Sequence, residues 1–407
     1  MLPALATIAL FAVIDLGPTL DDPAIWAEGA RPLALDRYEE YSWRGFPVWD
    51  SRVLTSSDGK RLERVELSLY NRGDADEKTT IGEKELETHL AELEKTFGEE
   101  KGAKVERTRL ADGALKFRSV HSAGERTIEI VWGLSAEDEN RKRAVEYLRA
   151  SVIGAKSSKA PTKKSSVEKQ SSLKANVVKD ANGDVRIAGV PMVNQGEKGY
   201  CAVATAERVL RYYGIHVDEH ELAQQAGTTS EGGTQTARMR EVARRIGERN
   251  GLGYQDILAI AVTTADYYKE IERYNKAAKA LDRKSLSPAD FTRDHVFYSD
   301  EMIEAMEPEV LLAARRRDSR LRRFSAAVRQ QVNAGVPVFW GVTLGLYREA
   351  IANPQSRGGH MRLIIGYNDR TNEILYTDSW GSGHELKRLA ADEAFAMTHD
   401  AYILKLR

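Results

Sequence analysis

The sequence predicts an α+β protein with a small α+β domain, a linker and a larger α+β domain. Its 407 residues exceed what a single hydrophobic core usually serves, which favours two domains. Between residues 21 and 154, apolar residues recur both in alternation and at helical spacing. Residues 155–184 begin with a Ser/Lys-rich stretch without an apolar period, and we expect them to form a flexible linker. From residue 185 to residue 407, helical patterns come first and strand patterns follow.

The elements of the first domain follow from these two periods. Alternation of Val65, Leu67 and Leu69 with polar residues predicts a strand over residues 61–70. Leucines at helical spacing predict a helix over residues 82–97. Further strands are expected over residues 105–110, 115–121 and 126–132, and a closing helix over residues 137–152. The domain gathers no group of nucleophiles, bases or metal ligands, so the sequence assigns it no chemistry.

The second domain is expected to begin its helical half with a helix from Cys201 to Tyr213, which Gly214 ends. A long, charged stretch over about residues 252–333 indicates a helical insertion. The other elements are predicted as helices over residues 218–226, 236–247 and 299–333, and as strands over residues 336–344, 361–367 and 373–380.

Residues 1–20 are a candidate signal or anchor segment. Their apolar run, residues 2–14, has the length of a signal-peptide core but is short for a membrane span. The positive residues that usually precede such a run are missing, and Asp15 interrupts the region that follows it. A periplasmic or secreted location is one expectation, and a cytoplasmic location with a buried first element is the alternative. No other segment is apolar enough to predict an integral membrane domain.

The composition of the chain argues against some kinds of binding partner. The formal net charge is −1, whereas phosphate binding needs an excess of Lys and Arg, so nucleic acid is not an expected partner. The dense basic run from Arg315 to Arg317 lies in a predicted helix that also carries acids, which is typical of a solvated face. Cys201 is the only cysteine, so no internal disulfide can form. Composition leaves the oligomeric state open.

A polar, glycine-containing loop delivers that single cysteine to the first turn of a helix. Unpaired backbone N–H groups and the positive end of the helix dipole stabilise a thiolate there, and they lower a thiol pKa from about 8.5 towards neutrality. Gln195 lies six residues upstream of Cys201, where its amide could donate a hydrogen bond to an oxyanion in front of the sulfur. The pattern therefore indicates an activated nucleophile.

A base and a carboxylate follow far downstream. His360 enters a predicted strand directly after Gly358 and Gly359, and the two glycines leave room for a substrate. Asp378 lies near the end of the next predicted strand, in the segment Asp378-Ser-Trp-Gly381. Because neighbouring strands bring such residues together, Asp378 is positioned to fix the imidazole of His360.

The order Gln195, Cys201 at a helix start, Gly359-His360 on a strand, then Asp378-Ser-Trp-Gly381 resembles the papain-like cysteine peptidase superfamily. Within it, the helix that begins Cys201-Ala-Val-Ala is most similar to the bacterial bacteriocin-processing, double-glycine type. The resemblance covers the part after the linker and implies a papain-like fold. It implies that Cys201 is the nucleophile, His360 the general base, Asp378 its orienting partner and Gln195 an oxyanion donor. Papain-like relatives commonly have Asn in the third position, so Asp378→Asn is expected to retain much of the activity.

Four further residues are candidates for substrate binding: Gly232, Gly233, Gly359 and Trp380. Gly232 and Gly233 lie between two predicted helices, where they would let a peptide backbone approach the wall of a cleft. An ordinary loop explains that pair of glycines equally well.

The segment from His216 to His220 formally matches the H-x-x-E-H pattern of a zinc peptidase family. That motif needs both histidines on one face of a helix, whereas Gly214 ends one predicted helix and Asp218 is a typical N-cap of the next. We therefore expect surface histidines and no metal site. The chemistry predicted for Cys201 needs no cofactor.

The sequence thus predicts a thiol-dependent hydrolase that cleaves peptide bonds in a peptide or protein substrate. Two alternatives use the same residues. An acyl transferase of the transglutaminase type would pass the acyl group to an amine in place of water, and a catalytically inactive module would only bind peptides.

Overall fold

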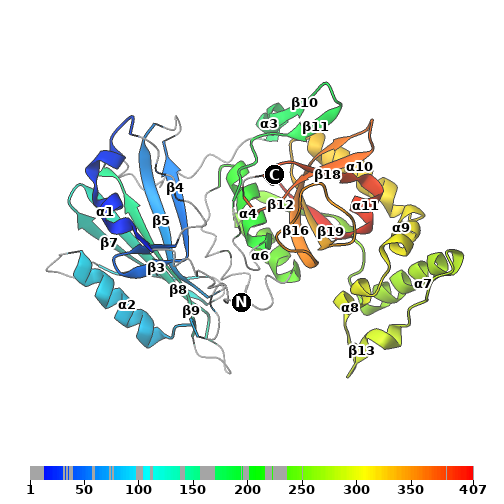
Figure 1. Cartoon of the computed structure of the whole chain (residues 1–407), viewed down its shortest axis with the longest axis horizontal. Helices are drawn as coiled ribbons and strands as arrows, with labels where there is room; N and C mark the ends of the chain where they lie inside the picture. Colours follow the sequence, from blue (N-terminus) through cyan, green and yellow to red (C-terminus); the bar gives the residue numbers. More distant parts are fainter. Residues whose placement is uncertain are drawn as a thin grey trace, which may run out of the picture. The chain divides into compact units, whose positions relative to one another are not determined.

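The computed structural model folds into two compact units, residues 1–164 with 229–231 and residues 165–228 with 232–407 (Figure 1). The structure describes residues 13–406 apart from 31–32, 34, 36–39, 57–59, 73–74, 76–77, 98–103, 111–112, 138–142, 156–169, 194, 196–200, 216–221, 223–235, 250 and 382. The predicted helix over residues 218–226 therefore lies almost entirely outside the described residues, as does most of the candidate signal segment. Within the described part, no helix has the length and apolarity needed to cross a membrane.

The first unit is built on an antiparallel six-stranded sheet. Its strands follow the order β4-β5-β9-β8-β7-β6. They are β4 (Asp50–Thr55), β5 (Leu62–Asn71), β6 (Glu106–Arg109), β7 (Leu115–Ala123), β8 (Arg126–Leu134) and β9 (Val145–Ile153). Helix α2 (Glu83–Thr96) buries Leu86 and Leu93 in one core with Leu67 of β5 and Ile130 of β8. The strands and the helix predicted over residues 61–132 are confirmed.

Smaller elements complete this unit. A three-stranded sheet orders its strands β1-β2-β3, and a short helix and a 3₁₀ turn follow β1. Their bounds are β1 (Ile14–Asp15), α1 (Leu16–Asp21), η1 (Pro23–Trp26), β2 (Tyr41–Trp43) and β3 (Phe46–Val48). Leu16, Leu20 and Trp43 are buried in the same core as the large sheet.

The helix predicted over residues 137–152 is wrong, because β9 occupies residues 145–152 of that range. β9 lies between β5 and β8 and pairs with both along its length. A central strand gains hydrogen bonds on both edges, and Val145, Leu148 and Ala150 are buried there. These tertiary interactions outweigh the local helical pattern.

The second unit is built on an eight-stranded sheet that carries the candidate site. The order is β10-β11-β16-β15-β19-β12, and β17 pairs with β16 and β18. The strands are β10 (Val177–Lys179), β11 (Asp184–Ile187), β12 (Leu252–Ala259), β15 (Val338–Leu344), β16 (Gly358–Asn368), β17 (Glu373–Thr377), β18 (Lys387–Ala390) and β19 (Thr398–Leu406). The predicted strands over residues 336–380 are confirmed.

Helices cover both faces of this sheet. Figure 1 shows α4 and α6 on one side, and α10 and α11 on the other. Their bounds are α4 (Cys201–Tyr212), α6 (Thr236–Arg249), α10 (Arg320–Asn333) and α11 (Ala391–Ala396). The helix predicted from Cys201 is confirmed, and almost every one of its residues after the first is buried. The unit is α+β, as predicted.

Part of the expected linker belongs to this unit. α3 (Gln170–Leu173), η3 (Lys174–Asn176) and β10 all lie within residues 155–184. Leu173 is fully buried in the core of the second unit, and β11 pairs with β16. The sequence did not predict these elements, because β10 and β11 form the edge of the sheet and need very few apolar residues.

The charged region over residues 252–333 also differs from expectation at its start. Its first eight residues form β12, an edge strand that pairs with β19. Helices then follow: α7 (Thr264–Ala280), η4 (Pro288–Phe291), α8 (Ser299–Glu304) and α9 (Pro308–Arg316), with the short hairpin β13 (Thr292–Arg293) and β14 (Val296–Phe297). These helices share a small core of their own, which includes Ile271, Tyr274, Met302 and Val310.

Candidate active site

Helix α4 places the single cysteine at its first residue. The first N–H groups of a helix have no partner within the helix, so the backbone at Cys201 offers donors to an anion. The Cys201 side chain is partly exposed, whereas Ala202 and Val203 behind it are buried. Thr205, one turn further, donates a hydrogen bond from Oγ1 to the carbonyl of Met361 at 3.3 Å. This bond fixes the helix to strand β16.

His360 and Asp378 come from neighbouring strands. β16 and β17 pair in antiparallel register with Leu363 opposite Thr377, so the residue after β17 lies beside the start of β16. His360 Nε2 donates to Asp378 Oδ1 at 3.2 Å, and both side chains are fully buried. The other ring nitrogen, Nδ1, is buried and forms no hydrogen bond of ordinary geometry with a described residue. That nitrogen is left for the thiol of Cys201.

The electrostatics of Cys201 and His360 favour an ion pair. Burial raises the pKa of the Cys201 thiol, but the interaction with His360, whose positive charge favours the thiolate, outweighs burial, so the pKa lies below its ordinary value. Burial lowers the pKa of His360, but Asp378 and the Cys201 thiolate together bring it above its ordinary value. The two opposite shifts have a common cause, since each group stabilises the charged form of the other.

The sequence matches the Peptidase_C39 like family over residues 187–298 and 317–403. The second unit belongs to this family. The match confirms the resemblance to papain-like cysteine peptidases of the bacteriocin-processing type. Between the two matched segments lie residues 299–316, which contain α8 and α9.

Two solved structures are similar to this chain. The peptidase domain of Streptococcus ComA, a bifunctional ABC transporter involved in a quorum-sensing pathway, is 12% identical, with a TM-score of 0.27 over 54% of this chain and 100% of that domain. Xylellain, a cysteine protease from Xylella fastidiosa, is also 12% identical, with a TM-score of 0.24 over 58% of this chain and 89% of its own. No curated protein matches the sequence.

In this C39-like unit, Asp378 is held by two cations besides His360. Arg362 donates from Nε to Oδ1 at 2.7 Å and from Nη2 to Oδ2 at 3.2 Å. Lys387 donates from Nζ to Oδ2 at 2.9 Å. The attraction of these groups outweighs burial and holds the pKa of Asp378 well below its usual range. Asp378 is therefore a carboxylate whose oxygens both accept hydrogen bonds from buried cations.

A second carboxylate balances these cations. Glu349 accepts from Arg362 Nη2 at 2.9 Å and lies 2.9 Å from Lys387 Nζ, and Tyr376 donates its hydroxyl to the same carboxylate. The side chains of Glu349, Arg362 and Lys387 are at most 4% exposed. Two carboxylates and two cations thus form a buried, charge-balanced cluster behind His360, which we call the Asp378 cluster.

Trp380 covers the imidazole. Its ring is stacked on that of His360, with centroids 4.2 Å apart and an interplanar angle of 6°. Trp380 is only 4% exposed, so it offers little surface to a substrate. We expected this residue in substrate binding, and the structure instead packs it against the His360–Asp378 pair.

Gln195 is joined to the loop that follows Asp378. Its backbone N–H donates to the carbonyl of Ser379 at 2.7 Å. The side-chain Oε1 is buried and accepts no hydrogen bond from a described residue. Residues 196–200, which connect Gln195 to Cys201, lie outside the described part of the chain.

Of the three glycines predicted to bind substrate, the structure describes one. Gly232 and Gly233 lie outside the described residues. Gly359, next to His360, is exposed, and a Cβ built there would meet no atom within 4 Å. The backbone at Gly359 therefore has open space beside it.

Arg208 ties the parts of the site together and was not predicted from the sequence. It lies two turns after Cys201 and donates to the carbonyls of Pro191 and Asp378 at 2.7 and 2.8 Å, and to Thr377 Oγ1 at 2.7 Å. Its side chain is almost fully buried, and desolvation lowers its pKa to about 10. One guanidinium thus fixes the loop before Cys201 and the strand end at Asp378 to the same helix.

Among the described residues, no group of three or more His, Cys, Asp or Glu is arranged to hold a metal ion. His216 and His220 lie outside the described part, so the expectation that they bind no metal stays a prediction.

Proposed function

We propose that the second unit is a thiol-dependent peptide hydrolase with Cys201 as nucleophile, His360 as general base and acid, and Asp378 as the residue that orients His360. The observation that carries the proposal is the position of one imidazole between a helix-start thiol and a buried carboxylate. The pKa values of Cys201 and His360 shift in opposite directions, towards a thiolate and an imidazolium. Opposite shifts of this kind cluster at functional sites, and they support a catalytic role for the pair.

The reaction follows from these positions. The Cys201 thiolate attacks the carbonyl carbon of the scissile peptide bond and forms a tetrahedral intermediate with a negative oxygen. The backbone N–H of Cys201 and the Gln195 amide donate hydrogen bonds to that oxygen. The His360 imidazolium gives its proton to the departing amine, and the carbon–nitrogen bond breaks to leave a thioester on Cys201.

Hydrolysis of the thioester completes the cycle. Water attacks the thioester carbonyl while neutral His360 takes its proton, and the carbon–sulfur bond breaks. The product is a free carboxylic acid, and the thiolate and imidazolium are restored. Asp378 keeps the Nε2 proton in place throughout, so Nδ1 remains the nitrogen that exchanges protons with the reacting groups.

The proposal is tested by incubating the full chain with a peptide library and identifying new termini by mass spectrometry. Cys201→Ala and His360→Ala are the matched controls, and we expect both to abolish cleavage while circular dichroism shows an intact fold. New termini that persist in Cys201→Ala would refute the proposal. Adding a primary amine separates hydrolysis from acyl transfer, because a transferase would yield the amine adduct in place of the acid.

A further inference from the structure

Glu349 lies one step further from the sulfur than Asp378 does. It comes from the connection between β15 and β16, residues 345–357. Its carboxylate accepts hydrogen bonds from Arg362 Nη2, at 3.0 and 2.9 Å, and from Asn353 Nδ2 at 2.9 Å. The imidazole of the site bonds to Asp378 instead. Any effect of Glu349 on the reaction therefore passes through the Asp378 cluster.

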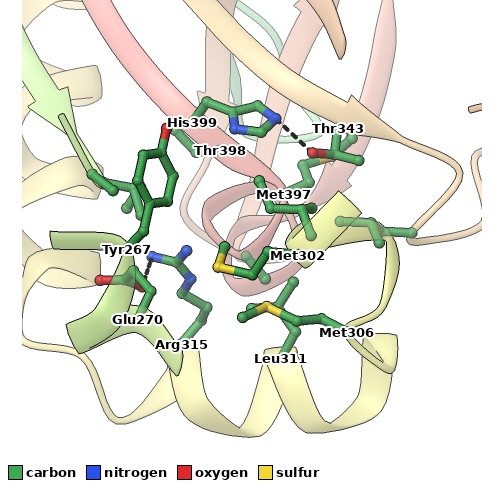
Figure 2. A pocket seen from close by; sticks show the side chains of 15 residues that line it. Tyr267, Glu270, Met302, Met306, Leu311, Arg315, Thr343, Met397, Thr398 and His399 are labelled. Atoms are coloured by element: carbon green, nitrogen blue, oxygen red, sulfur yellow. Dashed lines mark hydrogen bonds and ion pairs between the residues drawn. The ribbon is translucent and has the colours of Figure 1, made fainter. Parts of the chain in front are cut away.

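The charged helical region fixes the first residues of this connection. Leu346 packs in the small core of that region, and it lines one cavity with Met302 of α8 and Met397, the residue after α11. Figure 2 shows both methionines in this core, where the helices meet the main sheet. Tyr347 donates its hydroxyl to the carbonyl of Pro308, the first residue of α9, at 3.1 Å. The chain just before Glu349 is therefore anchored by packing and by a hydrogen bond.

The rest of the connection is fixed on the side of the site. Asn353 accepts hydrogen bonds from both cations of the Asp378 cluster. Gln355 donates from Nε2 to the carbonyl of Gly359 at 3.3 Å, one residue before His360. The connection is thus held before and after Glu349. A group that tunes a reactive pair must itself be held in place, and Glu349 meets that condition.

Glu349 is a carboxylate at neutral pH. Burial raises the pKa of its carboxyl, but the attraction of Arg362 and the hydrogen bonds from Lys387 and Tyr376 outweigh burial, so the pKa lies below its ordinary value. Asp378 faces the same two cations, with Arg362 Nε at 2.7 Å and Lys387 Nζ at 2.9 Å. One carboxylate offsets only one of them. Without the charge of Glu349, the cluster would carry one positive charge beside the imidazole.

That missing charge would change the protonation of the reactive pair. A nearby positive charge stabilises the Cys201 thiolate and destabilises the His360 imidazolium, so both groups would lose their protons at lower pH. The pair is reactive between these two pH values, where the thiolate has formed and the imidazolium is retained. Its reactive range would therefore move to lower pH.

Other charged and titratable groups face the pair without belonging to the Asp378 cluster. Arg208 of α4 donates to the carbonyl of Asp378 at 2.8 Å, and its charge is attracted by Asp378 and Glu385. His384 lies edge-on against Trp380, with ring centroids 5.6 Å apart. These groups are identical in every variant compared below, so a difference between those variants reports the charge of the cluster.

We propose that Glu349 is a positioning residue for the reaction, which balances the charge around Asp378 so that His360 keeps its proton at neutral pH. The inference rests on the proposed function, in which the Cys201 thiolate and the His360 imidazolium are the reactive forms. Glu349 acts through the two cations of the cluster. At an effective dielectric constant of about 20, a unit charge roughly 10 Å away shifts a pKa by about one unit.

The test is the rate of Cys201 alkylation by iodoacetamide against pH in the full chain, a measurement that needs no substrate. The wild type should give one inflection for Cys201 and a second for His360. Glu349→Gln keeps the shape and removes the charge, and we expect both inflections to move down by about one pH unit. Lys387→Met should move both inflections to higher pH, because it leaves an excess of negative charge. The double variant Glu349→Gln, Lys387→Met is balanced again and should return both inflections close to the wild type.

Glu373→Gln is the matched control, because Glu373 pairs with Arg388 outside the cluster. Wild-type inflections in Glu349→Gln, or an equal shift in Glu373→Gln, would overturn the proposal. A purely structural role would lower stability without moving the inflections. If Glu349→Gln does not fold, Lys387→Met and the double variant differ by the same charge, and inflections that fail to move down between these two would overturn the proposal.

Failure of the proposed function gives a different result. In that case the wild type itself would show a single inflection near the free-thiol value of about 8.5, unchanged in His360→Ala, and the inference about Glu349 would fall with the Cys201–His360 pair. Two inflections in the wild type that Glu349→Gln leaves in place would refute the role of Glu349 alone.

Discussion

We expect that asparagine cannot replace Asp378, the third member of the proposed triad, in this chain. Asp378 accepts four hydrogen bonds, two on each oxygen, from His360, Arg362 and Lys387. Asparagine has one acceptor oxygen and one donor NH₂ group. In either orientation, the NH₂ group would face the donors of Arg362 or Lys387. The papain-like resemblance alone predicts a mild effect for Asp378→Asn, and the Asp378 cluster argues against it.

The charge balance of the Asp378 cluster sets how much stability Asp378→Asn should lose. Apart from the Cys201–His360 pair, which is neutral as a whole, the wild-type cluster has two carboxylates and two cations, whereas Asp378→Asn leaves one buried positive charge without a partner. Removing one partner of a buried ion pair typically costs about 3–5 kcal/mol. We expect the free energy of unfolding to fall by about that amount and kcat/KM to fall nearly as far as in Asp378→Ala.

A double variant tests whether the unpaired charge causes the loss of stability. Asp378→Asn with Lys387→Met removes one negative and one positive charge, so the cluster is balanced again. We expect this double variant to be more stable than Asp378→Asn alone by about 1–3 kcal/mol in urea unfolding. Asp369→Asn is the control, because Asp369 is exposed and pairs with Arg329 at the surface. Wild-type stability of Asp378→Asn, or a double variant less stable than the single one, would refute the account.

Three further predictions concern the surroundings of the site. Gln195→Ala should lower kcat by about 100-fold and leave the pH titration of the thiol unchanged, and a loss of thiol reactivity would show instead that Gln195 shapes the ion pair. Trp380→Ala should reduce the free energy of unfolding by about 3–5 kcal/mol and lower kcat/KM, while Trp380→Phe should retain more of both, and equal effects would argue against the stacking role. A fragment of residues 165–407 should fold alone and unfold at higher urea than a fragment of residues 185–407, which lacks Leu173 and β10, and equal midpoints would contradict that role of the segment.

Much of the second unit could be predicted because its signals are local. A polar loop before a helix, a glycine pair before a strand and a carboxylate at the end of the next strand are visible in the sequence. The order of those signals was enough to predict that His360 and Asp378 lie side by side, as they do in the structure. Arg362 could have been found in the same way, since it lies two residues after His360, on the same side of strand β16.

The other members of the Asp378 cluster could not be predicted. Glu349 comes from the connection between β15 and β16, and Lys387 begins β18, so no sequence period relates them to Asp378. Strand β9 was missed for a similar reason, because partners on both of its edges decide its conformation. β12 was missed because its pairing partner, β19, lies about 150 residues further along the chain.

The central claim is that His360 holds Cys201 as a thiolate, and the rate of alkylation by iodoacetamide against pH tests it most directly. The lowered pKa of Cys201 means that reactivity should rise at a lower pH than for a free thiol, whose pKa is about 8.5. The raised pKa of His360 means that the imidazolium persists to higher pH, so a second, smaller change should appear where it loses its proton. In His360→Ala both features should merge into one inflection near the free-thiol value. A single inflection near that value in the wild type, unchanged in His360→Ala, would contradict the account.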